Sequence, residues 1–371
     1  MSPMGASFAL LVSSLLVGSP SAQPQPEVVH EWTFVDYVWP DEESRIEALQ
    51  NGDYIPENCA ITGLKVYNGD IFVTTPRWKP GVPAALSRVV DGVLAPYPRW
   101  ELQEIGNCHA FQFVQSMEID ALGRMWIIDT GRAEGFNYSE PCPAKLRVWD
   151  IADERFIRMH EFPSSVVPPT NFLNDIVVDL TEEDAYAYIT DANEAALIVY
   201  RYRRDESWVA RHEVMLPTPG AETIIINGVE FSTNTAIDGI ALWNSEQVYF
   251  CPLTSFELYS IPTEILRNET LATGNLDDYI IEHPQRPSQA DGMVVVGDTL
   301  YFGSLAENAI YSYRVNNSYE MVARDDVTME WVDTFAVSDG YLWFTTNRLH
   351  LFFLGQLAED EPNFRIMRVP L

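Results

Sequence analysis

The chain has 371 residues, of which 47% are apolar, enough for a substantial core and too many for an intrinsically disordered protein. It carries 23 Lys and Arg against 54 Asp and Glu, a formal net charge of −31. Such an acidic surface repels nucleic acid and anionic membranes and attracts cations. We therefore expect neither a nucleic acid nor a membrane among its partners, and take a monomer as the default state.

The N-terminal segment resembles a signal peptide. An apolar run from Phe8 to Val17 precedes small residues that end at Ala22, and a Pro- and Gln-rich spacer follows. The pattern departs from the usual one because no Lys or Arg precedes the run. At roughly ten residues the run is too short to span a bilayer. We predict a signal peptide over residues 1–22, a single domain over 23–371, and a secreted, extracellular protein.

The rest of the chain is a succession of predicted β-strands in a recurring unit. Each unit has an apolar strand, a tight turn with Asp, Asn or Gly, and an aromatic-rich strand, and it continues into one or two more strands. Helical periodicity is scarce, with EESRIEALQNG the main exception. In chain order the units begin LKVYNGDIFVTT, MEIDALGRMWIID, IVVDLTEEDAYAYIT, IALWNSEQVYFCP, MVVVGDTLYFGS and TFAVSDGYLWFTT.

Six repeated units predict an all-β fold, a six-bladed β-propeller. The last unit looks incomplete, because only LHLFFLG and NFRIMRVPL follow it. The early strand-like stretch EVVHEWTFVDYVW has no unit of its own. Pairing of the N- and C-terminal strands in one blade would close the ring and leave no open sheet edge. We predict this closure.

One loop in the first unit has an unusual composition. IFVTT is followed by PRWKPGVP, whose three prolines exclude a central strand, and AALSRVV resumes the extended pattern. The loop is therefore expected to join the second and third strands of the first blade. We interpret Arg77, Trp78 and Lys79 as an internal cluster in which both cations pair with acidic residues of an adjoining blade. The alternative is a contact at the rim of the channel.

The four cysteines suit an oxidising compartment. They are too widely spaced for a C-x-x-C motif, and an even number suggests two disulfides, for which three pairings exist. We expect Cys108–Cys142, because both residues lie at the edge of the second unit. Cys59 and Cys251 then form the second pair by elimination, or remain unpaired thiols.

Three Asn-x-Ser/Thr sequons accompany the predicted signal peptide. Each triplet alone is a weak signal, since chance also produces it, but a secreted chain would expose such sites to glycosylation. The candidate glycosylation sites are Asn137, Asn268 and Asn316.

Several distinctive segments follow one another over roughly residues 28–370: TTPRWKPGVPAALSRV, MEIDALGRMWIIDTGR, CPAKLRVWDI, FLNDIVVD, AIDGIAL, FCPLTSFELYSIPTEILRN, SQADGM and WVDTFA. In sequence and in order, these segments resemble the yellow/major royal jelly protein family. The resemblance implies a secreted six-bladed propeller, in agreement with the repeat count. It also implies mixed functions: dopachrome-converting enzymes of melanin synthesis, salivary proteins that bind biogenic amines, and nutritive proteins that assemble with partners. The fold therefore transfers better than the function.

Polar residues stand at the start of the first strand in four successive units, and in a propeller this strand lines the central channel. Converging carboxylates and an amide suit a cation, either Ca²⁺, which takes 6–8 oxygen ligands, or the ammonium group of a ligand. The alternative is that each Asp caps a turn or binds backbone N–H groups between blades. The residues are Asn174, Asp175, Asp238, Asp291, Asp333 and Thr334.

The resemblance to amine-binding members adds candidate ligand-binding residues. Thr334 and Asn347 occupy positions that would hydrogen-bond a ligand, and Phe344 lies nearby. An aromatic wall beside hydrogen-bond acceptors suits an aryl-ethylamine, through stacking and cation–π attraction. The alternative places Phe344 in the core and Asn347 in a turn.

Catalytic motifs are absent from the sequence. There is no nucleophile elbow, H-E-x-x-H, P-loop or dinucleotide fingerprint, and the six histidines are scattered. We therefore expect a secreted protein that binds a small cationic or aromatic ligand in its channel, with no required cofactor. One alternative is a dopachrome-converting isomerase in which Asp175 or another channel carboxylate is the base. The other is a structural or nutritive protein with an empty or plugged channel.

Overall fold

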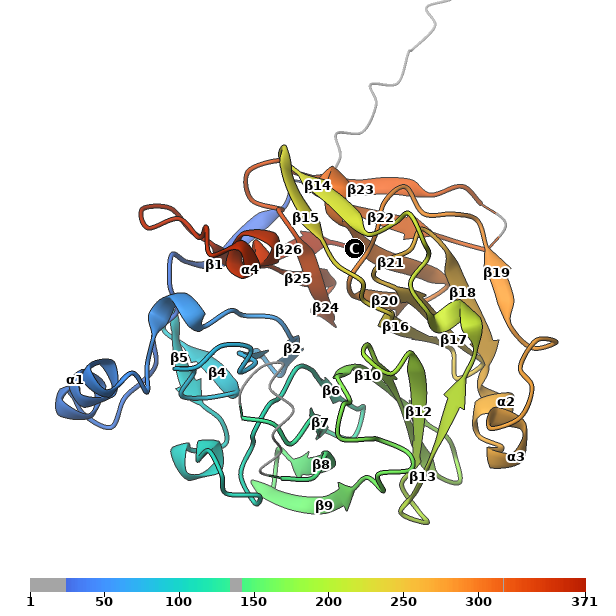
Figure 1. Ribbon diagram of the computed structural model, residues 1–371, viewed down its shortest axis with the longest axis horizontal. Coiled ribbons are helices and arrows are strands. Elements are labelled where there is room, and N and C mark those ends of the chain that lie inside the picture. Colours follow the sequence, from blue (N-terminus) through green and yellow to red (C-terminus); the bar gives the residue numbers. More distant parts are fainter. Residues whose placement is uncertain (1–24, 134–141, 316) are drawn as a thin grey trace, which may run out of the picture.

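The computed structural model describes residues 25–133, 142–315 and 317–371. Six four-stranded antiparallel sheets surround a central axis as the blades of a propeller (Figure 1), which confirms the predicted all-β fold. The predicted signal peptide and the sequons at Asn137 and Asn316 lie outside the described residues. Within the described ranges, no helix has the length and apolar character needed to cross a membrane.

The blades follow one another around the ring in sequence order. In each of blades 1–5 the innermost strand is the first in sequence and the outermost strand the last. Blade 1 contains β2 (Leu64–Tyr67), β3 (Asp70–Thr74), β4 (Leu86–Val90) and β5 (Val93–Pro96), and blade 2 contains β6 (Met117–Ile119), β7 (Arg124–Asp129), β8 (Lys145–Asp150) and β9 (Arg155–Glu161). Blade 3 contains β10 (Leu173–Leu180), β11 (Ala185–Asp191), β12 (Ala196–Arg201) and β13 (Glu206–Arg211), and blade 4 contains β16 (Ile237–Trp243), β17 (Gln247–Pro252), β18 (Leu258–Pro262) and β19 (Ile281–His283). Blade 5 contains β20 (Met293–Val296), β21 (Thr299–Ser304), β22 (Ala309–Tyr313) and β23 (Glu320–Arg324).

Blade 6 closes the ring as predicted. It contains β24 (Val332–Ser338), β25 (Tyr341–Thr346) and β26 (Phe364–Pro370), and its outer strand is the N-terminal β1 (Glu27–Trp32). The pairing of β1 with β26 is antiparallel and sets Trp32 opposite Phe364. Trp32 is nearly buried, and its Nε1–H donates to Gly92 O of blade 1 at 2.6 Å. The same residue thus joins the closing strand to the first blade.

A threonine hydroxyl on the second strand joins successive blades. Thr74 Oγ1 accepts the N–H of Gly63 in its own blade at 2.8 Å and donates to Gln115 O of blade 2 at 2.7 Å. The same pair of bonds recurs at Thr190, between blades 3 and 4, and at Thr345, between blades 6 and 1. Each hydroxyl is fully buried and satisfies two backbone groups that the ladder leaves free.

Short helices and one extra hairpin lie between the strands, some within a blade and some between blades. The segment LHLFFLG, which follows the sixth unit, forms a helix that begins after Arg348 at φ 46° and ends at Gly355 with φ 68°. A two-stranded hairpin between blades 3 and 4 is a second element that the repeat analysis did not anticipate. These elements are α1 (Glu42–Asn51), α2 (Thr263–Leu266), α3 (Glu269–Ala272), α4 (Leu349–Leu354), the 3₁₀ turns η1 (Pro56–Asn58), η2 (Trp100–Gln103), η3 (Glu213–Met215) and η4 (Leu305–Glu307), and the hairpin β14 (Thr223–Ile226) and β15 (Val229–Ser232).

The cysteines form one of the two expected disulfides. Cys108 and Cys142 are bonded, as predicted. Cys59 and Cys251 are both buried free thiols, so the second disulfide is wrong and the alternative of unpaired thiols is confirmed. The reason is geometric, since Cys59 precedes blade 1 and Cys251 lies in β17 of blade 4, across the ring.

Replacing Trp32 tests the closure. Trp32→Ala should lower the free energy of unfolding by about 3–5 kcal/mol, because a large buried side chain and a bond between blades are both lost. Val28→Ala, on the same strand but 38% exposed, is the matched control and should cost far less. Urea unfolding followed by circular dichroism measures both. Equal losses in the two variants would show that β1 does not hold the ring together.

Candidate functional site

The polar residues predicted for the channel lie at two levels. Asn174, Asp238, Asp291 and Asp333 share one register, each two residues before the pair that begins the regular ladder of its blade. In blades 1 and 2 this position is taken by Thr62 and Gln115. All six residues are at most 8% exposed. We call them the waist ring: Thr62, Gln115, Asn174, Asp238, Asp291 and Asp333.

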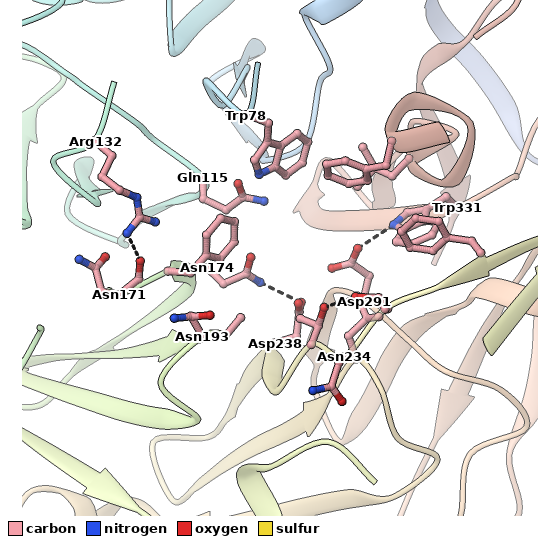
Figure 2. A pocket seen from close by; sticks show the side chains of 18 residues that line it. Trp78, Gln115, Arg132, Asn171, Asn174, Asn193, Asn234, Asp238, Asp291 and Trp331 are labelled. Atoms are coloured by element: carbon pink, nitrogen blue, oxygen red, sulfur yellow. Dashed lines mark hydrogen bonds between the residues drawn. The ribbon is translucent and has the colours of Figure 1, made fainter. Parts of the chain in front are cut away.

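An upper chamber of about 350 Å³ lies on one side of the waist ring (Figure 2). Its floor includes Gln115, Asn174, Asp238 and Asp291, and Arg132 and three asparagines contribute to its wall. The remaining wall is largely aromatic. The aromatic residues are Trp78 from the β3–β4 loop, Phe172 before β10, Phe231 from β15, Trp331 before β24 and Phe353 from α4.

A lower chamber of about 220 Å³ lies on the other side of the ring. Lys65, Glu118, Asp175 and Thr334 contribute its polar lining, and the innermost strands of blades 3 to 6 contribute the rest. A cavity of only about 10 Å³ lies at the ring itself, beside residues of both chambers. Asp175 and Thr334 therefore belong to the constriction and the lower chamber, not to the upper one.

Asp238 and Asp291 form the most unusual contact of the floor. Asn174 Nδ2 donates to Asp238 Oδ1 at 2.8 Å, and Trp331 Nε1 donates to Asp291 Oδ2 at 2.7 Å. The two carboxyl groups are also hydrogen-bonded to each other. Burial raises the pKa of Asp238 to about 7 and the pKa of Asp291 well above its usual range. A hydrogen bond between two carboxyl groups requires a proton on one of them, because two carboxylates have no hydrogen to share.

Of the other two channel carboxyls, Asp333 is buried and Asp175 is half-buried. Asp333 accepts hydrogen bonds from Thr334 Oγ1 at 2.9 Å and Asn347 Nδ2 at 2.5 Å, yet burial raises its pKa well above the usual range. Asp175 accepts from Ser116 Oγ at 2.8 Å, and burial raises its pKa to about 6 although the charge of Lys65 opposes this rise.

Asn347 and Phe344 lie outside both chamber linings. Asn347 is fully buried and donates to Ile61 O at 3.0 Å as well as to Asp333, so it supports the waist ring from behind. Phe344 packs in the core of blade 6 against Phe335, which corrects its assignment as the aromatic wall. The aromatic wall comes instead from loops and inserted elements. Strand periodicity does not predict where these lie relative to the channel.

The loop PRWKPGVP joins β3 to β4, as predicted, and serves both of its proposed roles. Arg77 is 1% exposed and is internal, but its partners are backbone carbonyls and not carboxylates. Lys79 Nζ donates to Phe352 O of α4 at 2.7 Å, and Trp78 contributes to the chamber wall. The carbonyls bound by Arg77 are those of Val82, Pro83, Gln103, Phe111 and Gln112.

The channel offers little to a metal ion. Among residues 25–133, 142–315 and 317–371, no group of three or more His, Cys, Asp and Glu is arranged to hold one. Ca²⁺ requires 6–8 oxygen ligands, whereas the oxygens of Asp238 and Asp291 already accept bonds from Asn174 and Trp331.

Fold and site together define a six-bladed β-propeller with a polar-floored, aromatic-walled chamber at one end of its channel. The family model described as "Major royal jelly protein" matches residues 112–371, and the chain belongs to this family.

Individual relatives extend the match over the whole chain. The chain is 29% identical over 389 residues to Protein yellow of Drosophila melanogaster, covering 98% of this chain and 72% of that protein. It is 28% identical over 388 residues to Protein yellow of Drosophila subobscura, covering 98% and 68%. A solved aldose sugar dehydrogenase from Streptomyces coelicolor in its PQQ-bound form has a TM-score of 0.51 and 10% identity, covering 95% of this chain and 99% of that chain. At that identity the last likeness shows the fold alone.

The raised pKa of Asp238 predicts an unusual dependence of stability on pH. Asp238 is 4% exposed and keeps its proton up to about pH 7 in the folded chain, whereas an unfolded Asp loses it near 3.9. The unfolded state therefore binds fewer protons in this window, so the free energy of unfolding falls as pH rises from about 4 to 7, by up to about 4 kcal/mol from this group.

Urea unfolding between pH 4 and 8 measures this dependence. Asp238→Asn should reduce the slope by about one proton. Asp298→Asn, at a side chain that is 77% exposed, should leave it unchanged. An unchanged slope in Asp238→Asn would show that Asp238 ionises normally in the folded protein.

Proposed function

We propose that this protein binds a small aromatic cation, of the biogenic-amine type, in the upper chamber. The main support for this proposal is a cavity of about 350 Å³ that has two carboxyls in its floor, Asp238 and Asp291, and an aromatic wall. Ligand pockets for small molecules are mostly apolar clefts of about 300–1,000 Å³ with a few placed polar groups. An ammonium group at the floor would neutralise the carboxyls, and its aryl group would lie among the aromatic side chains.

Gln115 supports the same orientation of a ligand. Its side chain is 8% exposed, and its Oε1 has no hydrogen-bond partner. Figure 2 shows the amide extending into the chamber beside Trp78 and Asn174. A buried acceptor without a partner costs about 1–3 kcal/mol, which a ligand N–H or O–H donor would recover.

A dopachrome-converting activity is the second candidate, favoured by one observation. Burial raises the pKa of Asp238 to about 7 and that of Asp175 to about 6, and a general base works best when its pKa lies near the operating pH. Either carboxylate could remove a proton next to a carbonyl or iminium group. The two residues lie in different chambers, so single variants separate the two sites.

Calorimetric titration with dopamine, serotonin and Ca²⁺ tests the binding proposal. The amines should bind, and an analogue with a propionate in place of the ethylamine should not. Asp291→Asn and Phe231→Ala should each weaken binding at least about tenfold, since each removes roughly 1.4 kcal/mol or more. Asp298→Asn, exposed and far from the chamber lining, should bind normally.

A dopachrome assay on the same preparations separates the candidates. Amine binding without turnover supports the binding protein. Multiple turnovers that Asp238→Asn or Asp175→Asn abolishes would establish the enzyme instead. Absence of both binding and turnover would favour the structural or nutritive role.

We further propose that the protein is secreted. Support comes from the signal-like residues 1–22, from the Cys108–Cys142 disulfide and from the exposed sequon at Asn268. Asn268 begins α3 with its side-chain oxygen accepting from Leu271 N, which leaves the amide nitrogen free for a glycan.

Expression in insect cells tests secretion and glycosylation together. The protein should appear in the medium without residues 1–22 and should lose mass on enzymatic removal of N-glycans. Thr270→Ala is the sharper variant, because it destroys the sequon yet retains Asn268 at the start of α3. It should lack one glycan. Retention in the cell at the full mass of the chain would contradict the proposal.

A further inference from the structure

The carboxyls of Asp238 and Asp291 are held together by the packing of their blades. Glycines follow both residues, and the strands approach so closely that a Cβ on Gly239 would lie 2.0 Å from Asp291 O. A Cβ on Gly292 would lie 2.3 Å from Asp333 O. This close approach of the backbones sets Asp238 and Asp291 beside each other, where their carboxyl groups are in hydrogen-bond contact.

No cation compensates these two carboxyls in the described part of the chain. Asp238 and Asp291 take part in no ion pair there, and the charge of Asp175 opposes the ionisation of both. Behind them, burial raises the pKa of the Cys251 thiol to about 11, so this group stays neutral. The nearest lining cations are engaged elsewhere: Lys65 in the lower chamber pairs with Glu118 at 3.0 Å, and Arg132 donates to the carbonyls of Asn171 and Pro169.

The buried, unpartnered Oε1 of Gln115 is an independent sign that a ligand belongs above this pair. It lines both the upper chamber and the constriction, and it is the floor group that lacks any partner of its own. A ligand that fills the chamber therefore contacts the carboxyl pair and Gln115 at once.

We propose that the ligand-free channel stores one proton between Asp238 and Asp291, and that a cation entering the upper chamber displaces it to solvent. The inference rests on the proposed amine-binding function and names its regulation. With the shared proton the pair has a charge of −1; with the proton gone and an ammonium group bound it is again −1. The exchange therefore never leaves an uncompensated second charge in a buried site, which would cost several kcal/mol.

Ligand affinity is consequently linked to pH. Below the pKa of the pair, each ligand bound releases one proton, so the dissociation constant should fall about tenfold for each unit that the pH rises. By reciprocity, acidification should release bound ligand. Proton-coupled exchange of this kind allows loading at neutral or alkaline pH and unloading at acidic pH.

The stored proton can be observed without any ligand. The Trp331 indole N–H donates to Asp291, so its nuclear magnetic resonance should report the ionisation of the pair. With isotopic labelling of the indole nitrogens, and Trp331→Phe for assignment, the resonance should titrate at least about two pH units above the 3.9 of a solvated Asp. In Asp238→Asn the amide can donate to Asp291, and the midpoint should fall. A wild-type midpoint near 4 would overturn the stored proton.

The displacement is tested by calorimetry with tryptamine between pH 5.5 and 9, where its amine keeps its charge up to about pH 9. Titrations at one pH in phosphate and in Tris, which differ in ionisation enthalpy, should show release of about one proton per ligand. Asp298→Asn should behave as the wild type, and Asp238→Asn should bind with a flatter pH dependence.

The outcomes separate the two proposals. Binding with neither a pH slope nor proton release would overturn the exchange and leave amine binding intact. No binding at any pH between 5.5 and 9 would contradict both the exchange and the proposed ligand, whatever the indole resonance shows.

Discussion

The first strands of neighbouring blades touch almost without side chains between them, and this contact determines the dimensions of the channel. Gly239 and Gly292 leave no space for a Cβ, and Thr74, Thr190 and Thr345 replace the missing side-chain packing with hydroxyl bonds from one blade to the next. The residues that precede these two glycines, Asp238 and Asp291, belong to the waist ring, so their place in the ring is tied to how closely these blades pack.

The waist ring has an acidic half and a neutral polar half, so the floor of the upper chamber is acidic on one side only. Blades 4 to 6 contribute the carboxyls Asp238, Asp291 and Asp333, whereas blades 1 to 3 contribute a hydroxyl and two amides. The aromatic wall is held above this ring by elements outside the repeat. Phe231 of the β14–β15 hairpin stacks on Phe353 of α4 with 6.1 Å between ring centroids, and Phe353 also contacts Trp78 at 5.1 Å. The propeller thus supplies the charged floor, and its insertions supply the wall.

The sequence predicted the part of this arrangement that repeats. Six strand–turn–strand units predicted the blades and their closure, and the polar residues at the start of each first strand predicted the ring. It did not resolve the register, because a bulge at the start of β10 aligns Asn174, and not Asp175, with Asp238 and Asp291. A shift of one residue transfers a carboxyl from the upper chamber to the lower one.

The parts that do not repeat left no periodic signal. Phe344 has the composition of a channel aromatic, but strand alternation directs it into the core of blade 6. LHLFFLG has the composition of a strand, yet the positive φ of Arg348 starts a helix that covers the blade end. The direction of such a side chain and the helical or extended state of such a segment depend on tertiary contacts, which form only once the ring has closed.

Burying acidic groups in the waist ring lowers the stability of the fold. An apolar or amide residue in place of Asp238 would avoid the cost of burying a group that can ionise. Residues that break a local rule without a local gain are typical of functional sites, where stability is given up for a chemical property of the native state. Here that property is a proton held at neutral pH beside a cavity that a cation can enter. Because the buried carboxyl pair destabilises the fold, its presence supports a functional role for the channel.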